Sequence, residues 1–576
     1  MKLTALKANG YRNLDGTYVL PAPLAVLVGE NNAGKSNVID ALRIVLEPES
    51  EPGPGGRLWP EDFAHDGRGA SPTTELDLEV QLADLSEAEQ ARMVTCLAPS
   101  LGAGCARLRL HARLRPDNRV VVQWFGGDSA HPEVERHARE GVRFAYLHPL
   151  RDAAADLRPG RQNRLVDLLA ALATEGDRDR IVAEAENANE AIGKIPAVEA
   201  AKGKIAERLL AMTGSGRFRQ QTDLAFADPR FERVVSALRA RIGQFEALEM
   251  AENGLGFNNL LYMAVLLAAI ADAPEDGALR VLLVEEPEAH LHPQLQDLLM
   301  RFLEDQAGGP TQVLVTSHSP NFASSARVER LVVLARAPGD LNPVARAPRD
   351  FGLSEKQLNH LRRFLDVTKA SLFFARAVVL VEGVSEQLLL PPIAHRLGLS
   401  LVENGVSVID IGGVAFPPFT DLFGPEKLPY RLAVVSDSDG QPSAEDLAGA
   451  EDSLSPRAEA LAARAGDNIR VRLAPNTLEW ALVAAGNVEI ALDALAAVKP
   501  QVAERLREEI DSRDPKAAAD PILGAIKDVK GRFAQELAEL LGDEEREFVV
   551  PDFLRESIEW VTEPQPADAV DIPKEG

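Results

Sequence analysis

A phosphate-binding loop near the N-terminus constrains this chain more than any other feature. Residues 29–36 read Gly-Glu-Asn-Asn-Ala-Gly-Lys-Ser, which is the pattern G-x-x-x-x-G-K-S. The apolar run 24–28 before it predicts a buried strand, and the segment 36–42 after it predicts the start of a helix. This arrangement points backbone N–H groups at a phosphate chain. The sequence therefore predicts an ATP site, with Lys35 on the β- and γ-phosphates and Ser36 on a Mg²⁺ ion; a glycine-rich turn beside a core strand is the alternative. The residues expected to bind the nucleotide are Gly29, Asn31, Asn32, Gly34, Lys35, Ser36 and Asn37.

An acidic strand end far downstream supplies a second part of such a site. Residues 281–286 form an apolar run that ends in Glu285 and Glu286. In P-loop enzymes such a strand lies beside the P-loop strand, so we expect Glu285 to hold Mg²⁺ and Glu286 to act as the general base toward water. The next apolar run, 311–316, is followed by His318, which we expect to sense the γ-phosphate. Solvated acids at a strand end and a structural histidine are the alternatives.

A glycine-containing segment between these two parts opens an apolar helix predicted over Leu260–Ile270. Gly254 and Gly256 suit an anion site at a helix N-terminus, although a plain loop before a helix has the same pattern. Together these features resemble the ATP-binding-cassette ATPases of the SMC and RecF type over residues 1–340. The resemblance implies that residues 254–259 occupy the place of the signature motif and that ATP is held between two subunits. The segment departs from the usual L-S-G-G-Q wording of that motif.

The C-terminal third carries a separate set of acids, each placed after an apolar run. Glu382 follows residues 377–381, and Glu386 comes within the first turn of the helix expected next. Asp437 and Asp439 follow the run 431–436, and side chains two residues apart in an extended segment point the same way. Carboxylate oxygens suit Mg²⁺ or Mn²⁺. A helix cap with a surface acid and a polar turn are the alternatives for the two segments taken singly.

Taken together, the two acidic segments resemble a Toprim domain, the metal-binding fold of topoisomerases, primases and some nucleases. An ABC-type ATPase followed by Toprim resembles the overcoming-lysogenization-defect (OLD) family of nucleases, most of all the class that includes the nuclease subunit of the Gabija antiphage system. The resemblance implies a two-metal DNA endonuclease with Glu382 and Asp437 as catalytic residues. It implies a charge-stabilising role for Lys530, with Lys527 as the alternative. The implied metal ligands are Glu382, Glu386, Asp437, Asp439 and Glu479, the last with a helix-surface acid as the alternative.

Composition limits the classes of function that remain. The chain has a formal net charge of −26, which opposes nonspecific binding to nucleic acid on average but leaves room for a local basic groove. No apolar run is long enough to span a bilayer. The two cysteines, Cys96 and Cys105, suit a reducing compartment, so we expect a cytoplasmic protein without a disulfide framework. The expected partners are DNA and a second copy of the chain, with a tetramer as an alternative and a helicase-like protein as a candidate.

We therefore expect an α/β protein made of an ABC-type P-loop ATPase with a helical insertion, followed by a Rossmann-like Toprim domain. Rival functions are a RecF-like DNA-repair ATPase whose Toprim acids are structural, and a nucleotide-sensing scaffold without nuclease activity. The expected parts are two ATPase segments (1–150 and 246–345), a helical insertion that carries the dimer contact (151–245), a linker (346–372), the Toprim domain (373–562, with a helical insertion at about 485–525) and a disordered tail (563–576).

Overall fold

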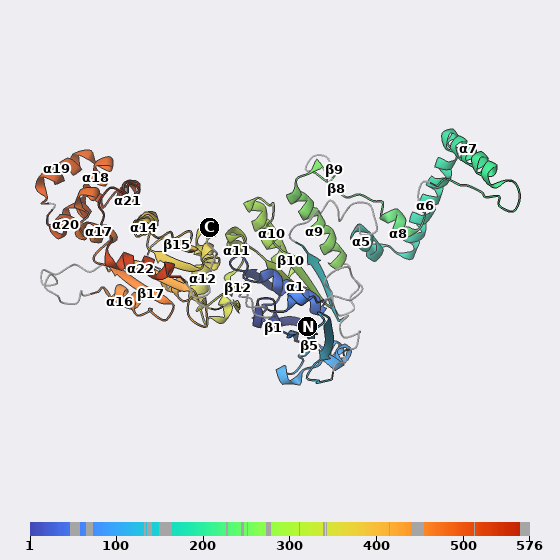
Figure 1. Ribbon diagram of the computed structural model, residues 1–576, viewed down its shortest axis with the longest axis horizontal. Helices are drawn as coiled ribbons and strands as arrows, with labels where there is room; N and C mark the ends of the chain where they lie inside the picture. The colour runs from blue at the N-terminus through green and yellow to red at the C-terminus, as the bar shows by residue number, and fades with distance from the viewer. Residues whose placement is uncertain are drawn as a thin grey trace. The chain divides into compact units, whose positions relative to one another are not determined.

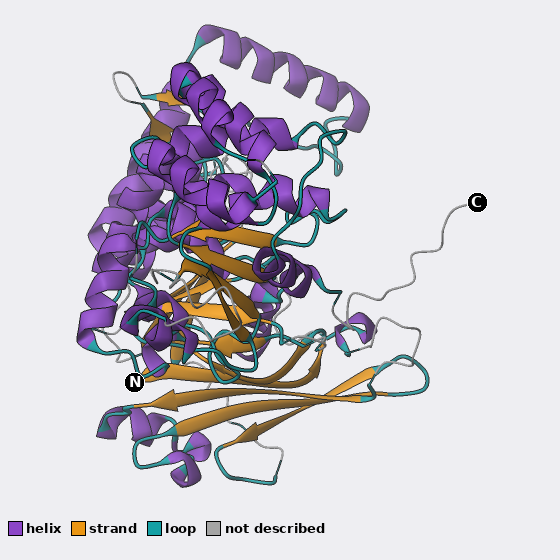
Figure 2. Cartoon of the chain, turned by 90° about the vertical axis from the view of Figure 1, so that its left-hand side faces the viewer, coloured by secondary structure: helices purple, strands orange, loops and turns teal. Residues whose placement is uncertain are grey.

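The computed structural model divides into two compact units, each described by itself below. The first comprises residues 1–144, 281–288 and 293–576, and the second comprises residues 145–280 and 289–292. Figures 1 and 2 show the chain from two directions. The structure describes residues 1–46, 58–64, 73–131, 134, 141–148, 164–225, 228–243, 247–249, 252–271, 278–309, 311–337, 340, 342–413, 415–438, 454–511 and 513–564.

The first sheet is antiparallel and is built from N-terminal strands in the order β2-β1-β4-β5-β6. Its β5 alternates between buried and partly exposed positions, as an apolar–polar alternation requires of a strand with one face on the core. Leu114 pairs with Val120 across the turn into β6. The strands are β1 (Lys2–Tyr11), β2 (Leu14–Val19), β4 (Glu75–Ala83), β5 (Ala106–Leu114) and β6 (Val120–Gly126), with the short helices η1 (Pro60–Asp62), α2 (Glu87–Arg92), η2 (Val94–Cys96) and η3 (Pro99–Leu101) between them.

The second sheet has the strand order β13-β12-β3-β11-β10-β7 and carries the P-loop. Its β3 is buried at every residue and runs parallel to β11 and β12. A parallel strand covered on both faces needs such a continuous apolar run. The elements are β3 (Leu24–Val28), α1 (Lys35–Leu46), β7 (Val142–Leu147), β10 (Leu279–Glu285), α10 (Pro293–Gln306), β11 (Thr311–Thr316), α11 (Pro320–Ser325), η5 (Val328–Arg330), β12 (Leu331–Ala335) and β13 (Val344–Arg346).

A third sheet, fully parallel, lies in the C-terminal part with the order β15-β14-β16-β17. Because β14 comes first in the chain and its two neighbours follow on opposite sides, the order reverses between β14 and β16. Ligands of open α/β sheets bind at such a switch point, at the carboxyl ends of the strands. The strands are β14 (Ala377–Val381), β15 (Val406–Asp410), β16 (Arg431–Asp437) and β17 (Ile469–Ala474).

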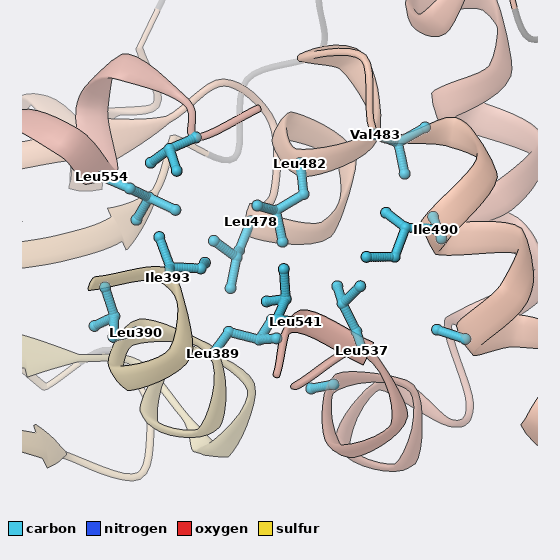
Figure 3. Close-up of a cluster of buried hydrophobic side chains, with 14 of the residues drawn as sticks. Leu389, Leu390, Ile393, Leu478, Leu482, Val483, Ile490, Leu537, Leu541 and Leu554 are labelled. Carbon is cyan, nitrogen blue, oxygen red and sulfur yellow. The ribbon is translucent and has the colours of Figure 1, made fainter. Parts of the chain in front are cut away.

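Helices pack around this sheet over a continuous apolar core. Leucines from three helices, among them Leu389, Leu482 and Leu537, are fully buried against one another (Figure 3). The helical part continues past the 485–525 segment expected from the sequence, because α21 shares this core. The helices are α14 (Val384–Arg396), α15 (Pro417–Thr420), α16 (Pro456–Ala462), α17 (Leu478–Ala484), α18 (Val488–Val498), α19 (Pro500–Glu509), α20 (Pro515–Ile526), α21 (Lys530–Leu541) and α22 (Asp552–Thr562).

Short helices connect the second sheet to the third. Ser354 caps α12 with a side chain that accepts a hydrogen bond from the backbone N–H of Gln357, and Asp366 caps α13 in the same way. These elements fill the 346–372 segment that the sequence assigned to a linker. They are η6 (Pro348–Asp350), α12 (Glu355–Phe364), α13 (Val367–Ala370) and η7 (Ser371–Phe373).

The second unit is mainly helical. Its α6 and α7 contain no buried residue, so their charged sequences and the apolar Leu210 and Met212 face solvent in this single chain. No helix in the described ranges is long and apolar enough to cross a bilayer. The elements are α5 (Arg164–Leu172), α6 (Glu175–Gly193), α7 (Pro196–Thr213), α8 (Phe231–Val235), β8 (Arg241–Ile242), β9 (Leu248–Glu249) and α9 (Leu255–Ala271).

Candidate functional sites

The P-loop lies where the sequence places it, between β3 and α1. A side chain at Gly29 would put its Cβ 2.4 Å from the backbone oxygen of Leu334, so only glycine fits there. Lys35 is 3% exposed, and its Nζ donates to the backbone oxygens of Gly29 (2.7 Å) and Glu30 (2.8 Å). Burial lowers the pKa of Lys35 to about 8, against the opposing charges of nearby glutamates. The loop therefore holds a desolvated ammonium inside the turn predicted to bind phosphate.

The outer side of the loop is fastened to the first hairpin. Asn13 donates to the backbone oxygen of Asn32 (3.2 Å), and Asn37 donates to Asn13 (2.7 Å). Arg12 in turn donates to the side-chain oxygen of Asn37 (2.8 Å). Asn37 thus has a structural role in fixing the loop, and its contact with a nucleotide stays a prediction. Of the remaining predicted binding residues, Asn31 and Ser36 are exposed, while Gly34 is buried.

The acids and the histidine predicted from the strand ends come together beside this lysine. Glu286 follows β10 in a left-handed conformation (φ +43°), which non-glycine residues adopt at a cost. Its Oε1 lies 3.2 Å from Nε2 of His318. Burial, and then the charge of Lys35, lower the pKa of His318, while Glu286 opposes them. Glu285 is buried at the end of β10. The roles assigned to these three residues stay predictions.

Glu288 is a residue that the sequence analysis did not identify as part of the site. It accepts hydrogen bonds from the hydroxyl of Ser317 (2.7 Å) and the backbone N–H of His318 (2.9 Å). Burial raises its pKa. Glu288 therefore sets the direction of the chain around His318. The sequence did contain one signal for this role, because Glu288 is a third carboxylate only two residues after Glu286.

The glycines expected to form the signature segment belong to the second unit. Helix α9 begins at Leu255, earlier than the Leu260 expected from the sequence, so Gly256 lies in its first turn. A Cβ at Gly256 would meet the backbone oxygen of His290 at 2.5 Å, which gives this glycine a packing role. Nucleotide binding by Gly254 and Gly256 stays a prediction.

One P-loop side chain faces the third sheet. The carboxylate of Glu30 accepts a hydrogen bond from Nε of Arg376 (3.1 Å) and lies 3.8 Å from Nη1 of Arg336. Arg376 directly precedes β14, whose other end leads into Glu382. A charged contact thus joins the phosphate-binding loop to the strand that carries the first of the C-terminal acids.

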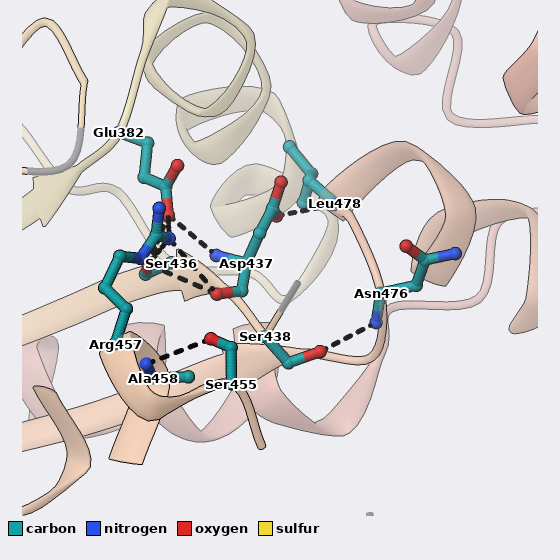
Figure 4. A network of polar contacts seen from close by, with 9 residues as sticks. All are labelled: Glu382, Ser436, Asp437, Ser438, Ser455, Arg457, Ala458, Asn476 and Leu478. Carbon is teal, nitrogen blue, oxygen red and sulfur yellow. Dashed lines mark hydrogen bonds and ion pairs between the residues drawn. The ribbon is translucent and has the colours of Figure 1, made fainter. Parts of the chain in front are cut away.

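Glu382 is held at the carboxyl end of β14 by three donors on one oxygen. Its Oε1 accepts from the Ser436 hydroxyl, from the backbone N–H of Asp437 (3.0 Å) and from Nη2 of Arg457 (2.6 Å) (Figure 4). Three donors on Oε1 leave Oε2 as the oxygen best placed to meet a cation. Ser436 and Arg457 were missed from the sequence, because a serine in an apolar strand and an arginine on a separate helix carry no local signal.

Asp437 lies opposite Glu382 at the end of β16. Its Oδ1 accepts from the backbone N–H of Leu478 (2.9 Å) at the start of α17. Burial, followed by the charges of Glu382, Glu386 and Glu479, raises its pKa to about 8. An aspartate that is protonated near neutral pH marks a site in which several negative charges are forced together.

The remaining acids complete this cluster. Glu386 is buried in the first turn of α14, and burial above all raises its pKa to about 7. Glu479 is 2% exposed and accepts a hydrogen bond from Nζ of Lys530 (2.8 Å). Burial works to lower the pKa of Lys530, but the bond to Glu479 and the surrounding carboxylates raise it. Lys527 is exposed, so the structure places Lys530 of the two candidate lysines against the acids.

This carboxylate site, defined as Glu382, Glu386, Asp437 and Glu479, fits a divalent cation in its chemistry. Buried carboxylates whose pKa values are raised gain from a hard cation that neutralises them. Within the described ranges, no three Asp, Glu, His or Cys side chains converge closely enough to hold one ion. Asp439, the remaining predicted ligand, lies outside the described residues.

The raised pKa values predict how stability depends on pH. A carboxyl group with a raised pKa in the folded state stabilises the fold at low pH and loses that contribution as the pH rises through the raised value. With pKa values raised from about 4 in the unfolded chain to about 7 for Glu386 and about 8 for Asp437, the metal-free chain should lose thermal stability from about pH 4 up to about pH 8 and level off above it. Thermal unfolding in EDTA measures this, and Asp437→Asn should show a shallower decline. Parallel curves for the two proteins would contradict the assigned shift of Asp437.

Comparisons with known proteins agree with this arrangement. Residues 243–324 match the family model described as an AAA domain of the putative AbiEii toxin, Type IV TA system. Residues 373–439 match the model described as the TOPRIM domain of overcoming lysogenization defect protein-like proteins. The predicted fold class, an ATPase followed by a Toprim domain in an α/β chain, is confirmed.

Relatives match most of the chain at low identity. The OLD nuclease of Thermus scotoductus is 23% identical over 72% of this chain and 78% of its own length. The uncharacterized protein YbjD of Escherichia coli strain K12 is 24% identical over 77% of this chain and 80% of its own. Endonuclease GajA of Bacillus cereus strain VD045 is 20% identical, with 72% of each chain covered.

Proposed function

We propose that the chain is an ATPase–Toprim protein of the OLD family and that it is a divalent-metal-dependent DNA endonuclease regulated by its ATPase module. The observation that carries the proposal is the carboxylate site at the switch point of the third sheet, with Lys530 bonded to Glu479. Two of the relatives are named as nucleases, which supports the same reading.

The residues of the site have two proposed roles, which are to bind the metal ions and to stabilise negative charge on the phosphate. Mg²⁺ or Mn²⁺, when bound, would polarise the phosphodiester and activate water. Glu382, Glu386, Asp437 and Glu479 would hold the ions, with Asp439 as a further ligand. Lys530 brings an ammonium to the place where negative charge builds on the scissile phosphate. Arg457 orients Glu382 by donating a hydrogen bond to its Oε1, which leaves Oε2 available to hold an ion.

The ATPase module is proposed to control this site through nucleotide binding. Lys35, Glu286 and His318 lie together at one end of the second sheet, as a P-loop ATPase requires. The ion pair of Glu30 with Arg376 gives a nucleotide-driven movement of the P-loop a direct effect on β14. This coupling is the regulatory part of the proposal.

Partners and setting follow from the same family premise. A homodimer through the ATPase is proposed, with a tetramer as an alternative, and the exposed apolar residues of α7 supply surface for contact between copies. DNA is the substrate, a helicase-like protein is a candidate partner, and antiphage defence is the proposed biological role. The free cysteines Cys96 and Cys105 support a cytoplasmic location.

Cleavage of supercoiled plasmid and linear duplex tests the proposal against its rival. The assay compares Mg²⁺, Mn²⁺ and EDTA, each with and without ATP. A nuclease should give nicked or linear products only with metal, and the ATP series gives the sign of the regulation. ATP-dependent DNA binding without strand cleavage would favour the RecF-like repair ATPase.

Arg457 provides a variant that separates orientation of Glu382 from ion binding itself. Groups that orient a metal ligand typically contribute about 10- to 100-fold in affinity or activity. Arg457→Met should therefore lower the cleavage rate by about 10- to 100-fold. Arg457→Lys should recover part of the loss, because the contacts with Glu382 and Ser436 come from a single nitrogen. Equal loss in both variants would argue against this role.

A further inference from the structure

One face of α12 lines a hollow that the proposed chemistry does not use. This face carries side chains three or four residues apart, namely Lys356, Asn359, His360 and Arg363. Phe364, four residues after His360, lies on the same face. These side chains line a hollow of about 890 Å³. Pro417 and Pro418 of α15 form its opposite wall. This surface is called the α12 groove below.

The groove is held in shape by contacts between its two walls. Gln357 donates a hydrogen bond to the side chain of Asp421, just after α15. The ring of His360 meets Phe419 edge-on, with centroids 6.0 Å apart, and stacks at a tilt on Phe364 at 4.5 Å. The groove is therefore a packed feature of the fold.

The charges on the groove are unbalanced. Arg362 is paired with Glu329 and Glu355, and Lys369 is paired with Asp366. In contrast, Lys356 and Arg363, both exposed, form no ion pair with any residue in the described ranges. The acids beside the groove are already engaged, since Asp421 also pairs with Arg464. The groove therefore presents two cations without an ion pair among the described residues, although the chain as a whole has a net charge of −26. Such a local positive charge favours an anionic ligand.

One wall of the groove follows the carboxyl end of β15 in sequence. The chain leaves β15 at Asp410 and reaches α15 at Pro417. Along this stretch, the backbone N–H of Gly413 donates to the backbone oxygen of Glu382 (2.7 Å). One wall of the groove is thus continuous in sequence with a segment that touches the first catalytic residue.

We propose that the α12 groove binds the phosphate backbone of substrate DNA, with Lys356 and Arg363 contacting phosphates and Phe364 packing against the sugars. This inference rests on the proposed nuclease function and names a surface that guides DNA toward the carboxylate site. A polyanion with regularly spaced phosphates matches two cations that lie about two turns apart on one face of a helix.

Salt-dependent binding of a fluorescent linear duplex by the full chain tests the proposal, with EDTA present to keep the duplex intact. The association constant K falls with salt, and each lost phosphate contact makes the slope of log K against log salt shallower by about 0.9. The double variant Lys356→Gln/Arg363→Gln should therefore have a slope shallower than that of wild type by about 1.8. The affinity ratio of wild type to variant should then shrink about tenfold between about 50 mM and about 200 mM salt. Lys516→Gln/Arg513→Gln, which removes two other exposed cations of the same domain, is the matched control.

Plasmid cleavage by the same proteins distinguishes the failure of this inference from that of the function. A wild type that cleaves, together with a groove variant whose salt slope equals that of wild type, overturns the groove alone. A slope lowered equally by the control pair also overturns it, because the effect would then be one of net charge. A wild type that neither binds nor cleaves DNA overturns the groove and the nuclease together.

Discussion

Replacing Asp437 with Asn should reduce metal-dependent cleavage by on the order of 1,000-fold, equivalent to about 4 kcal/mol of barrier. The change keeps the size of the side chain and an oxygen that can accept from Leu478, but it removes the charge that would hold a divalent ion. Initial rates of plasmid nicking at saturating Mg²⁺ measure the effect.

The fold should survive this substitution, which separates lost chemistry from lost structure. Burial and three neighbouring carboxylates already favour the neutral form of Asp437, so the metal-free variant should unfold at the same temperature as wild type or higher near pH 8. Asp467→Asn is the matched control, because Asp467 is exposed just before β17, at the opposite end of the sheet. Cleavage by Asp437→Asn at the rate of the control would exclude Asp437 from the site.

Replacing Lys35 with Ala should weaken ATP binding by about 100-fold or more, since hydrogen bonds to a charged group contribute about 1.5–3 kcal/mol each. The ammonium is the buried positive charge of the loop, and its loss leaves the backbone N–H groups as the main donors. Calorimetric titration with a non-hydrolysable ATP analogue measures the change. Lys7→Ala, an exposed lysine of β1, should bind ATP like wild type.

The same variant tests regulation. Cleavage by Lys35→Ala should no longer respond to ATP, whichever sign the response has in wild type. Arg376→Met adds a sharper comparison, because it should keep ATP affinity while weakening the response through the lost ion pair with Glu30. If both variants keep the full response, the P-loop does not control the carboxylate site.

Structural features that depend on a few consecutive residues could be predicted from the sequence. The run 24–28 became β3 at the expected residues. Five consecutive buried apolar positions between the end of the first hairpin and the P-loop suit a strand covered on both faces. Glu382 and Asp437 follow β14 and end β16, and two parallel strands paired side by side bring these acids together.

Partners brought in from distant segments could not be predicted in the same way. Arg457 reaches Glu382 across 75 residues, and Arg376 reaches Glu30 across 346. Such pairs depend on tertiary packing, which no local periodicity records. The start of α9 at Leu255 was also missed, because Gly254 and Gly256 lower helix propensity while close packing against His290 favours the helix.

Locating Mn²⁺ in crystals of the full chain shows where the metal binds, because the anomalous signal identifies the ion independently of activity. We expect a peak within about 2.0–2.5 Å of carboxylate oxygens of Glu382 and Asp437, and we expect it to be lost in crystals of Glu382→Gln. A peak bound elsewhere in a protein that still cleaves DNA, or an unchanged peak in Glu382→Gln, would contradict the assignment of the metal site to the carboxyl ends of β14 and β16.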